Sequence, residues 1–249
     1  MKTLKSPTLG YPQTLEITLT PTPNWRHVDF WRAVWITRSF DTCNDLPVGS
    51  RVLLVTSLTP DDLAMLSDHD VAVAQCPKTY LKLAMGTTPV RAMRAAGLAV
   101  GIGTDGVVSS NTLDVLEQMR LLALDQKQAA RDSTILPIQE VLAIAFAGGA
   151  QALRQPAIGA LAAGKLADIV LMRQDGAHLF PRHDPLANLV YSARAGDVAT
   201  VICDGKVLMR DRQLLTIDLP AVKAEVARRL ARLSQRAAER RLATYPIQG

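Results

Sequence analysis

The stretch Val100-Gly101-Ile102-Gly103-Thr104-Asp105-Gly106 decides how this chain is interpreted. The apolar and small residues at 98–102 predict a short buried strand. The glycines remove side chains where another part of the molecule comes close. Asp105 follows at the point where the strand ends, and α/β barrels keep their chemistry at the C-terminal ends of parallel strands. Because Asp-Gly is also a common turn dipeptide, Asp105 by itself is either a turn residue or a functional carboxylate.

The chain before this stretch alternates short strands with helices. Strands are predicted at 51–56 and 71–74. One helix begins after Thr59-Pro60, which supplies an N-cap residue and a proline at the first helical position. Another begins after Thr88-Pro89 and ends at Gly97. Such alternation with short loops predicts parallel pairing through right-handed crossovers.

Helices and then short strands are predicted after Gly106. The helical segments are 113–128 and 138–153. Ser109, Ser110 and Asn111 are candidate capping residues for the first of them, although contact with a ligand is an alternative. The predicted strands are 168–172, 198–203 and 206–210, and Asp204-Gly205 predicts a hairpin between the last two.

Three blocks of sequence carry a family resemblance. Residues 71–127 contain CP…LKLA.G..PV, then GTDG, a Ser/Asn-rich turn and LD…E.MR. Residues 158–171 contain G.L..GK.ADIV, and residues 183–206 contain HDP…V…DGK. In unbroken order over residues 50–218, they resemble the metal-dependent aminohydrolases of the amidohydrolase superfamily. The most similar branch holds S-adenosylhomocysteine and methylthioadenosine deaminases and triazine hydrolases.

The resemblance implies an α/β fold, namely a partial (β/α)8 (TIM-type) barrel with a small C-terminal β-sandwich portion and a C-terminal helix. The strands between residues 51 and 102 would be the last three of the barrel. The expected domains are an irregular N-terminal segment at 1–50, the partial barrel at 51–155, the β-sandwich portion at 156–218 and a basic helix at 219–249.

The resemblance also implies a zinc or iron site and hydrolysis of C–N bonds in purine- or triazine-like rings. The family's ligands are a His-x-His pair after the first barrel strand, a His after the fifth, commonly one after the sixth, and an Asp after the eighth. Asp105 matches that Asp, which binds the metal and accepts a proton from the attacking water. Asp105 is therefore expected to be both the catalytic residue and a metal ligand.

The other ligands have no match in this sequence. The chain has four histidines and no His-x-His, and residues 53–57 read Leu-Leu-Val-Thr-Ser where the family has its sixth-strand His. The histidines are His27, His69, His178 and His183. No glutamate near residues 36–40 can serve as the family's proton shuttle. Because a catalytic zinc takes three or more protein ligands, a bound zinc or iron and no metal at all both remain open.

Two hypotheses follow from this conflict. The first is an aminohydrolase of the deaminase and chlorohydrolase type that is incomplete or inactive as this single chain and acts, if active, on a small heterocyclic substrate. The second is a non-catalytic scaffold or interaction protein derived from that family. Cys76 is an alternative nucleophile, but no base is matched to it by spacing.

Charge and composition restrict location and partners. Residues 219–249 hold seven basic and two acidic side chains, which is the whole net charge of +5. An apolar stripe at Val222, Val226, Leu230 and Leu233 predicts an amphipathic helix there, and no aromatic side chains interleave with its arginines as nucleic-acid binding would favour. No apolar run reaches membrane-spanning length. Three scattered cysteines fit a reducing cytoplasm. The uncovered face of a half barrel predicts a homo-oligomer or a partner polypeptide.

Overall fold

The structure is a computed structural model that describes residues 3–5, 14–16, 33–36, 51–55 and 58–237. Side chains are described for residues 58–233. The chain divides into two compact units. One consists of Met1–Leu166 and Arg173–Asp197, and the other consists of Ala167–Met172 and Val198–Gly249.

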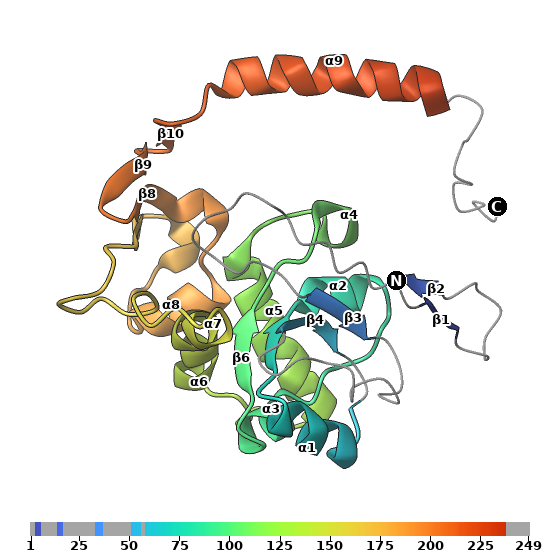
Figure 1. Ribbon diagram of the computed structural model, residues 1–249. Helices are drawn as coiled ribbons and strands as arrows, with labels where there is room; N and C mark the ends of the chain where they lie inside the picture. The colour runs from blue at the N-terminus through green and yellow to red at the C-terminus, as the bar shows by residue number, and fades with distance from the viewer. Residues whose placement is uncertain (1–2, 6–13, 17–32, 37–50, 56–57, 238–249) are drawn as a thin grey trace, which may run out of the picture. The chain divides into compact units, whose positions relative to one another are not determined.

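Four parallel strands form the sheet of the first unit, in the order β3-β4-β5-β6 (Figure 1). Their bounds are Ala33–Ile36, Arg51–Val55, Ala72–Gln75 and Ala99–Ile102. The strands predicted at 51–56, 71–74 and 98–102 are confirmed as β4, β5 and β6, and so is their parallel pairing. Within the described residues the sheet is open and holds half the strands of a (β/α)8 barrel.

Strand β3 lies in the segment that was expected to be irregular. The sequence pattern did not predict a parallel strand at 33–36, because four apolar residues without helix or turn signals beside them are a weak pattern. An antiparallel pair, β1 (Thr3–Lys5) with β2 (Thr14–Glu16), makes up the rest of the described structure before residue 50.

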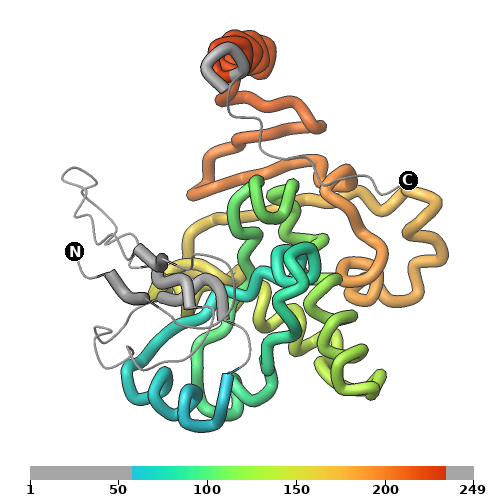
Figure 2. Tube along the Cα trace, turned by 90° about the vertical axis from the view of Figure 1, so that its right-hand side faces the viewer, coloured from blue at the N-terminus to red at the C-terminus, as the bar shows by residue number. Residues whose placement is uncertain are grey.

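Helices follow the strands in turn, as the tube in Figure 2 shows between residues 58 and 153. The predicted start of α1 (Pro60–Asp68) is confirmed. The Thr59 hydroxyl accepts the Asp62 N–H at 3.2 Å, and an Asp62 carboxylate oxygen accepts the Thr59 N–H at 2.7 Å. The next helices are α2 (Pro77–Lys82), α3 (Val90–Ala95) and α4 (Val107–Ser110).

The start of the long helix differs from the prediction. Ser109 and Ser110 lie inside α4, and Asn111 ends it with φ 66°, so none of the three caps α5 (Val115–Ala130). Asp114 is the cap instead, because its Oδ1 accepts the N–H groups of Leu116 and Glu117. A short polar residue caps the helix as predicted, but it lies a few residues later than the predicted ones.

The predicted helix at 138–153 is confirmed as three consecutive pieces, α6 (Ile138–Ala143), a π-helical turn η2 (Ile144–Gly148) and α7 (Gly149–Ala152). The first unit also contains α8 and two 3₁₀ turns, η3 and η4. Their bounds are Pro185–Tyr191, Ala177–Leu179 and Ala195–Asp197.

Backbone contact between η2 and β6 fixes the position of the last strand. A Cβ on Gly148 would lie 2.1 Å from the carbonyl oxygen of Val100, and one on Gly101 would lie 3.0 Å from Cα of Gly149. Neither position can hold a side chain without movement of the backbone. The expectation that glycine in this stretch allows close approach is therefore confirmed for Gly101.

The core of the first unit lies between the sheet and its helices. Val73 and Val100 from the sheet pack in one cluster with Met119 and Leu122 of α5 and with Ile144 of η2, all at most 3% exposed. This packing buries strand residues and helix faces together, so the strand order and the helix order depend on each other.

The second unit holds a four-stranded antiparallel sheet in the order β10-β9-β8-β7. Its strands are Ile169–Met172 (β7), Val198–Cys203 (β8), Lys206–Arg210 (β9) and Gln213–Leu214 (β10). The three predicted strands and the hairpin are confirmed, with φ of 49° at Asp204 and 73° at Gly205. The β-sandwich remains a prediction.

The expected basic helix is confirmed over the described residues as α9 (Leu219–Ala237), with Leu230 and Leu233 more than half exposed. The rest of the expected segment, 238–249, lies outside the described residues. Within the described part of the chain, none of the helices combines the length and the apolar character that crossing a membrane requires.

Replacing Gly148 with alanine should destabilise the protein by about 1 to 3 kcal/mol, because the new methyl group would overlap the Val100 carbonyl. The matched control is Gly149→Ala, whose Cβ would meet no atom within 4 Å. Because alanine favours a helix over glycine, that control should be neutral or stabilising by up to about 1 kcal/mol. Urea unfolding followed by circular dichroism measures both. Equal stability of the two variants would contradict the close crossing.

Candidate active site

The carboxyl ends of β5 and β6 meet at one edge of the sheet. Gln75 pairs with Ile102 at the last position of the register, and the Gly103 N–H donates to the Gln75 carbonyl at 2.7 Å. Cys76 follows β5 directly, and Asp105 lies three residues after β6. The predicted site residue and the alternative nucleophile are therefore neighbours in space.

Asp105 is held by hydrogen bonds to both of its carboxylate oxygens. The N–H of Gly106 donates to Oδ1 at 2.7 Å, and the hydroxyl of Thr79 donates to Oδ2 at 3.2 Å. The Asp105 backbone has φ 55°, in the left-handed region. Aspartate tolerates this region better than most residues because its short side chain bonds to nearby backbone groups. Asp105 therefore forms a tight turn and also presents a fixed carboxylate, so the two interpretations of this residue are compatible.

Cys76 has no nucleophilic character in this setting. Burial, and after it the negative charge of Asp105, raise the pKa of the Cys76 thiol to about 12. A hydrogen bond from the Asp105 backbone offsets part of this rise. Because the thiolate and not the thiol is the nucleophile, Cys76 is best described as a buried, unreactive residue that lines the site.

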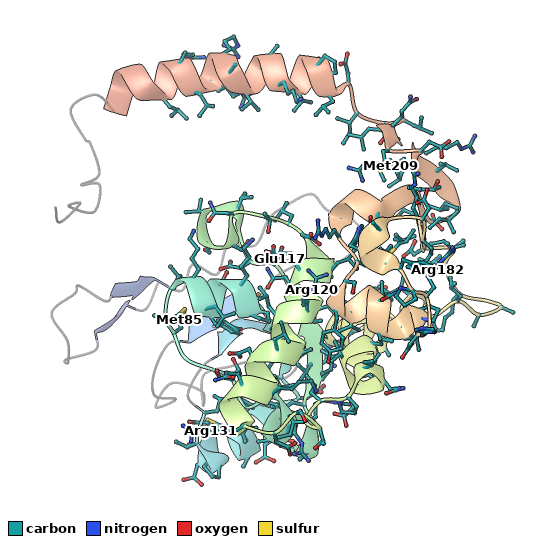
Figure 3. All side chains as sticks on the ribbon, turned by 180° about the vertical axis from the view of Figure 1, so that it is seen from behind. Met85, Glu117, Arg120, Arg131, Arg182 and Met209 are labelled. Atoms are coloured by element: carbon teal, nitrogen blue, oxygen red, sulfur yellow. The ribbon has the colours of Figure 1, made fainter. Side chains whose placement is uncertain are left out.

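The helices beside the site carry a charged network that the sequence analysis did not identify. The Lys78 ammonium lies 2.7 Å from Glu117 and 2.9 Å from the Thr112 hydroxyl. Glu117 and Arg120 both lie on α5 (Figure 3). The hydrogen bond from Lys78 is the main cause that lowers the pKa of Glu117. These partners are 34 and more residues apart in sequence, so spacing gives no sign of them.

Among the described residues, no group of three or more histidine, cysteine or acidic side chains could hold a metal ion. The His69 ring bonds the Met65 carbonyl at 2.9 Å, and the His178 ring bonds Asp197 at 2.9 Å. His183 is exposed, and His27 lies outside the described residues. Because a catalytic zinc takes three protein ligands, the donors described around Asp105 do not fit a zinc or iron centre.

Comparison with known proteins places this geometry in context. A model of the "Amidohydrolase family" matches residues 49–208. A 5-methylthioadenosine/S-adenosylhomocysteine deaminase of Pelotomaculum thermopropionicum is 45% identical over 179 residues, which cover 72% of this chain and 41% of that protein. The protein of the same name from Desulforudis audaxviator is 48% identical over 177 residues, covering 71% and 41%. The chain thus spans about two fifths of the length of these curated relatives.

Solved structures show the same relationship. An adenosine deaminase from Xanthomonas campestris with bound zinc has a TM-score of 0.71 and 33% identity, over 75% of this chain and 43% of that one. Atrazine chlorohydrolase from Arthrobacter aurescens, complexed with zinc, has a TM-score of 0.67 and 28% identity, over 72% and 40%.

Native Cys76 should resist alkylation by iodoacetamide at pH 8, since it is buried and its pKa is raised to about 12. Cys203 is exposed and should be modified in the native protein, although its own pKa is raised by the charge of Asp168. Asp105→Asn should lower the pKa of Cys76, because it removes a negative charge that disfavours the thiolate. Peptide mass spectrometry after labelling across a pH series measures both effects. Native labelling of Cys76 as fast as that of Cys203 would contradict the assignment of Cys76 as an unreactive residue.

Proposed function

The chain belongs to the amidohydrolase family, and from this membership we propose that it is the Asp105-bearing portion of a hydrolytic aminohydrolase. The observation that carries the proposal is the Asp105 carboxylate at the C-terminal end of β6, held by Thr79 and Gly106 inside the matched region. In this proposal Asp105 is both the catalytic proton acceptor and a metal ligand. The reaction class is hydrolysis of C–N bonds in purine- or triazine-like rings.

The described donors limit what the single chain does. Asp105 lacks companion ligands in the described part of the chain, and the 249 residues contain no His-x-His pair. We therefore propose that this chain alone is incomplete or inactive and that another polypeptide supplies further ligands for zinc or iron. The zinc-bound deaminase and chlorohydrolase neighbours support zinc as the metal of the completed site. A small heterocyclic substrate, for which 5-methylthioadenosine is the first choice, and a cytoplasmic location complete this proposal.

The alternative is a non-catalytic scaffold or interaction protein of the same ancestry. The donor set that fails to fit a metal is the observation that favours it. The expected division into a partial barrel at 51–155, a β-sandwich portion at 156–218 and a basic helix at 219–249 belongs to both proposals. The two differ only in whether the site works once it has been completed.

Purified chain should bind zinc substoichiometrically and hydrolyse 5-methylthioadenosine at background rate. Co-expression with the part of the Pelotomaculum relative that lies outside the matched residues should restore zinc binding and deamination. Mass-spectrometric metal analysis and an absorbance assay for ring deamination measure the two effects. Asp105→Asn should abolish the restored rate. The control is Asp125→Asn, which changes a half-buried carboxylate that bonds Thr87 in the same unit and should leave the rate intact.

Each outcome separates the two functions. Restored activity that depends on Asp105 supports the aminohydrolase. Assembly of the two pieces without zinc or activity supports the scaffold, and stoichiometric zinc with turnover by the chain alone would overturn the proposal that it is incomplete.

The chain should also associate with itself or with another polypeptide. Apolar side chains beside the site are exposed on α2, on the residues after it, and on α4: Leu81 (50%), Leu83 (52%), Val107 (54%) and Val108 (92%). Exposed apolar patches of this kind usually mark interfaces. Light scattering at micromolar concentration should give a mass above that of the monomer, and Leu81→Ser with Val108→Ser should reduce it. A monodisperse monomer of the unmodified chain would contradict self-association.

A further inference from the structure

Thr79 is a fully buried threonine whose hydroxyl points at the candidate catalytic carboxylate. Its exposed fraction is 0%, and its Oγ1 lies 3.2 Å from Oδ2 of Asp105. The other carboxylate oxygen already accepts the Gly106 N–H at 2.7 Å. Two donors on two different oxygens fix the plane of the carboxylate as well as its position. We propose that Thr79 is the positioning residue of Asp105, an inference that rests on the proposed function.

The first turn of α2 is locked, so that Thr79 can act as a fixed donor. The Lys78 N–H donates at 3.0 Å to Oε1 of Gln118, a side chain of α5 with 0% exposure. The Lys78 ammonium reaches Glu117 on the same helix at 2.7 Å and Thr112 at 2.9 Å. The backbone and the side chain of Lys78, which precedes Thr79, are therefore both held by hydrogen bonds. Supporting contacts of this kind are what keep a functional group within about 0.5 Å of its working geometry.

The backbone of Asp105 explains why a second donor is needed. With φ 55°, Asp105 sits in a conformation that costs free energy for most residues other than glycine. The bond from Gly106 is local and follows the turn wherever it moves. Thr79 comes from a different strand–helix connection, 26 residues earlier, and so ties the turn at the end of β6 to the helix that follows β5.

A purely structural role for Thr79 is the competing explanation. The chain offers a matched control, because the Thr87 hydroxyl donates to Oδ1 of Asp125 at 2.9 Å. Thr87→Val removes the same type of bond away from the candidate site. If Thr79 only supports packing, Thr79→Val and Thr87→Val should differ in stability alone.

The test compares Thr79→Val, Thr79→Ser and Thr87→Val in the full chain. The primary measurement is the ¹³Cγ NMR resonance of Asp105 at fixed pH, assigned by its loss in Asp105→Asn. Thr79→Val should shift this resonance, Thr79→Ser should restore it because serine keeps the hydroxyl, and Thr87→Val should leave it unchanged. A crystal structure of Thr79→Val should show the Asp105 carboxylate rotated.

The second measurement uses the assembly co-expressed with the rest of the Pelotomaculum relative. There, Thr79→Val should lower kcat by about 10- to 100-fold, as loss of a hydrogen bond to a ligand side chain does, with recovery in Thr79→Ser. An unchanged Asp105 resonance in Thr79→Val would overturn the positioning role. If the wild-type assembly has no activity, the proposed function fails, and the NMR comparison still decides the role of Thr79.

Discussion

The contact between the π-helical turn η2 and strand β6 is the constraint on which the first unit depends. Gly148 and Gly101 allow the two backbones to meet without side chains between them. The turn brings Ile144 into the core and closes over Val100, which would otherwise lie at the edge of the sheet described here. A sheet edge covered by a helix is protected from pairing with other chains. The same contact holds β6, the strand that leads into the turn at Asp105.

Desolvation determines the chemistry at that end of the sheet. Cys76 is buried beside Asp105 and stays a thiol, since a second negative charge there would be unfavourable. The Asp105 carboxylate is satisfied by Thr79 and Gly106, both neutral donors, and no cationic side chain is paired with it in the described part of the chain. Lys78, which precedes Thr79 on α2, is paired with Glu117 instead. Among the described residues, the donors that hold the Asp105 carboxylate in place are therefore neutral.

Local signals in the sequence predicted much of this fold. The features that were not predicted depend on contacts between residues far apart in the sequence. The capping residues at Thr59 and the hairpin at Asp204-Gly205 act within a few residues, so their patterns are visible in the chain. Strand β3 is defined by pairing with β4 and has little pattern of its own. The donor Thr79 is separated from Asp105 by 26 residues and is recognisable only when β5 and β6 lie side by side. Asp105 was singled out by its place after a strand together with the family resemblance, whereas its hydrogen-bond partner Thr79 could be recognised only from the fold.

The family's fold and the family's chemistry depend on different residues of this chain. The core at Val73, Val100 and Met119 and the glycine contacts below the site involve no metal-binding side chain. The Asp105 carboxylate accepts hydrogen bonds from two protein donors, Thr79 and Gly106. A sequence can therefore keep this half of the fold without keeping a metal centre, and fold alone does not decide activity. The role of Asp105 then depends on whether another polypeptide brings metal ligands to the carboxyl end of β6. The hydrogen bonds that hold the carboxylate are already in place.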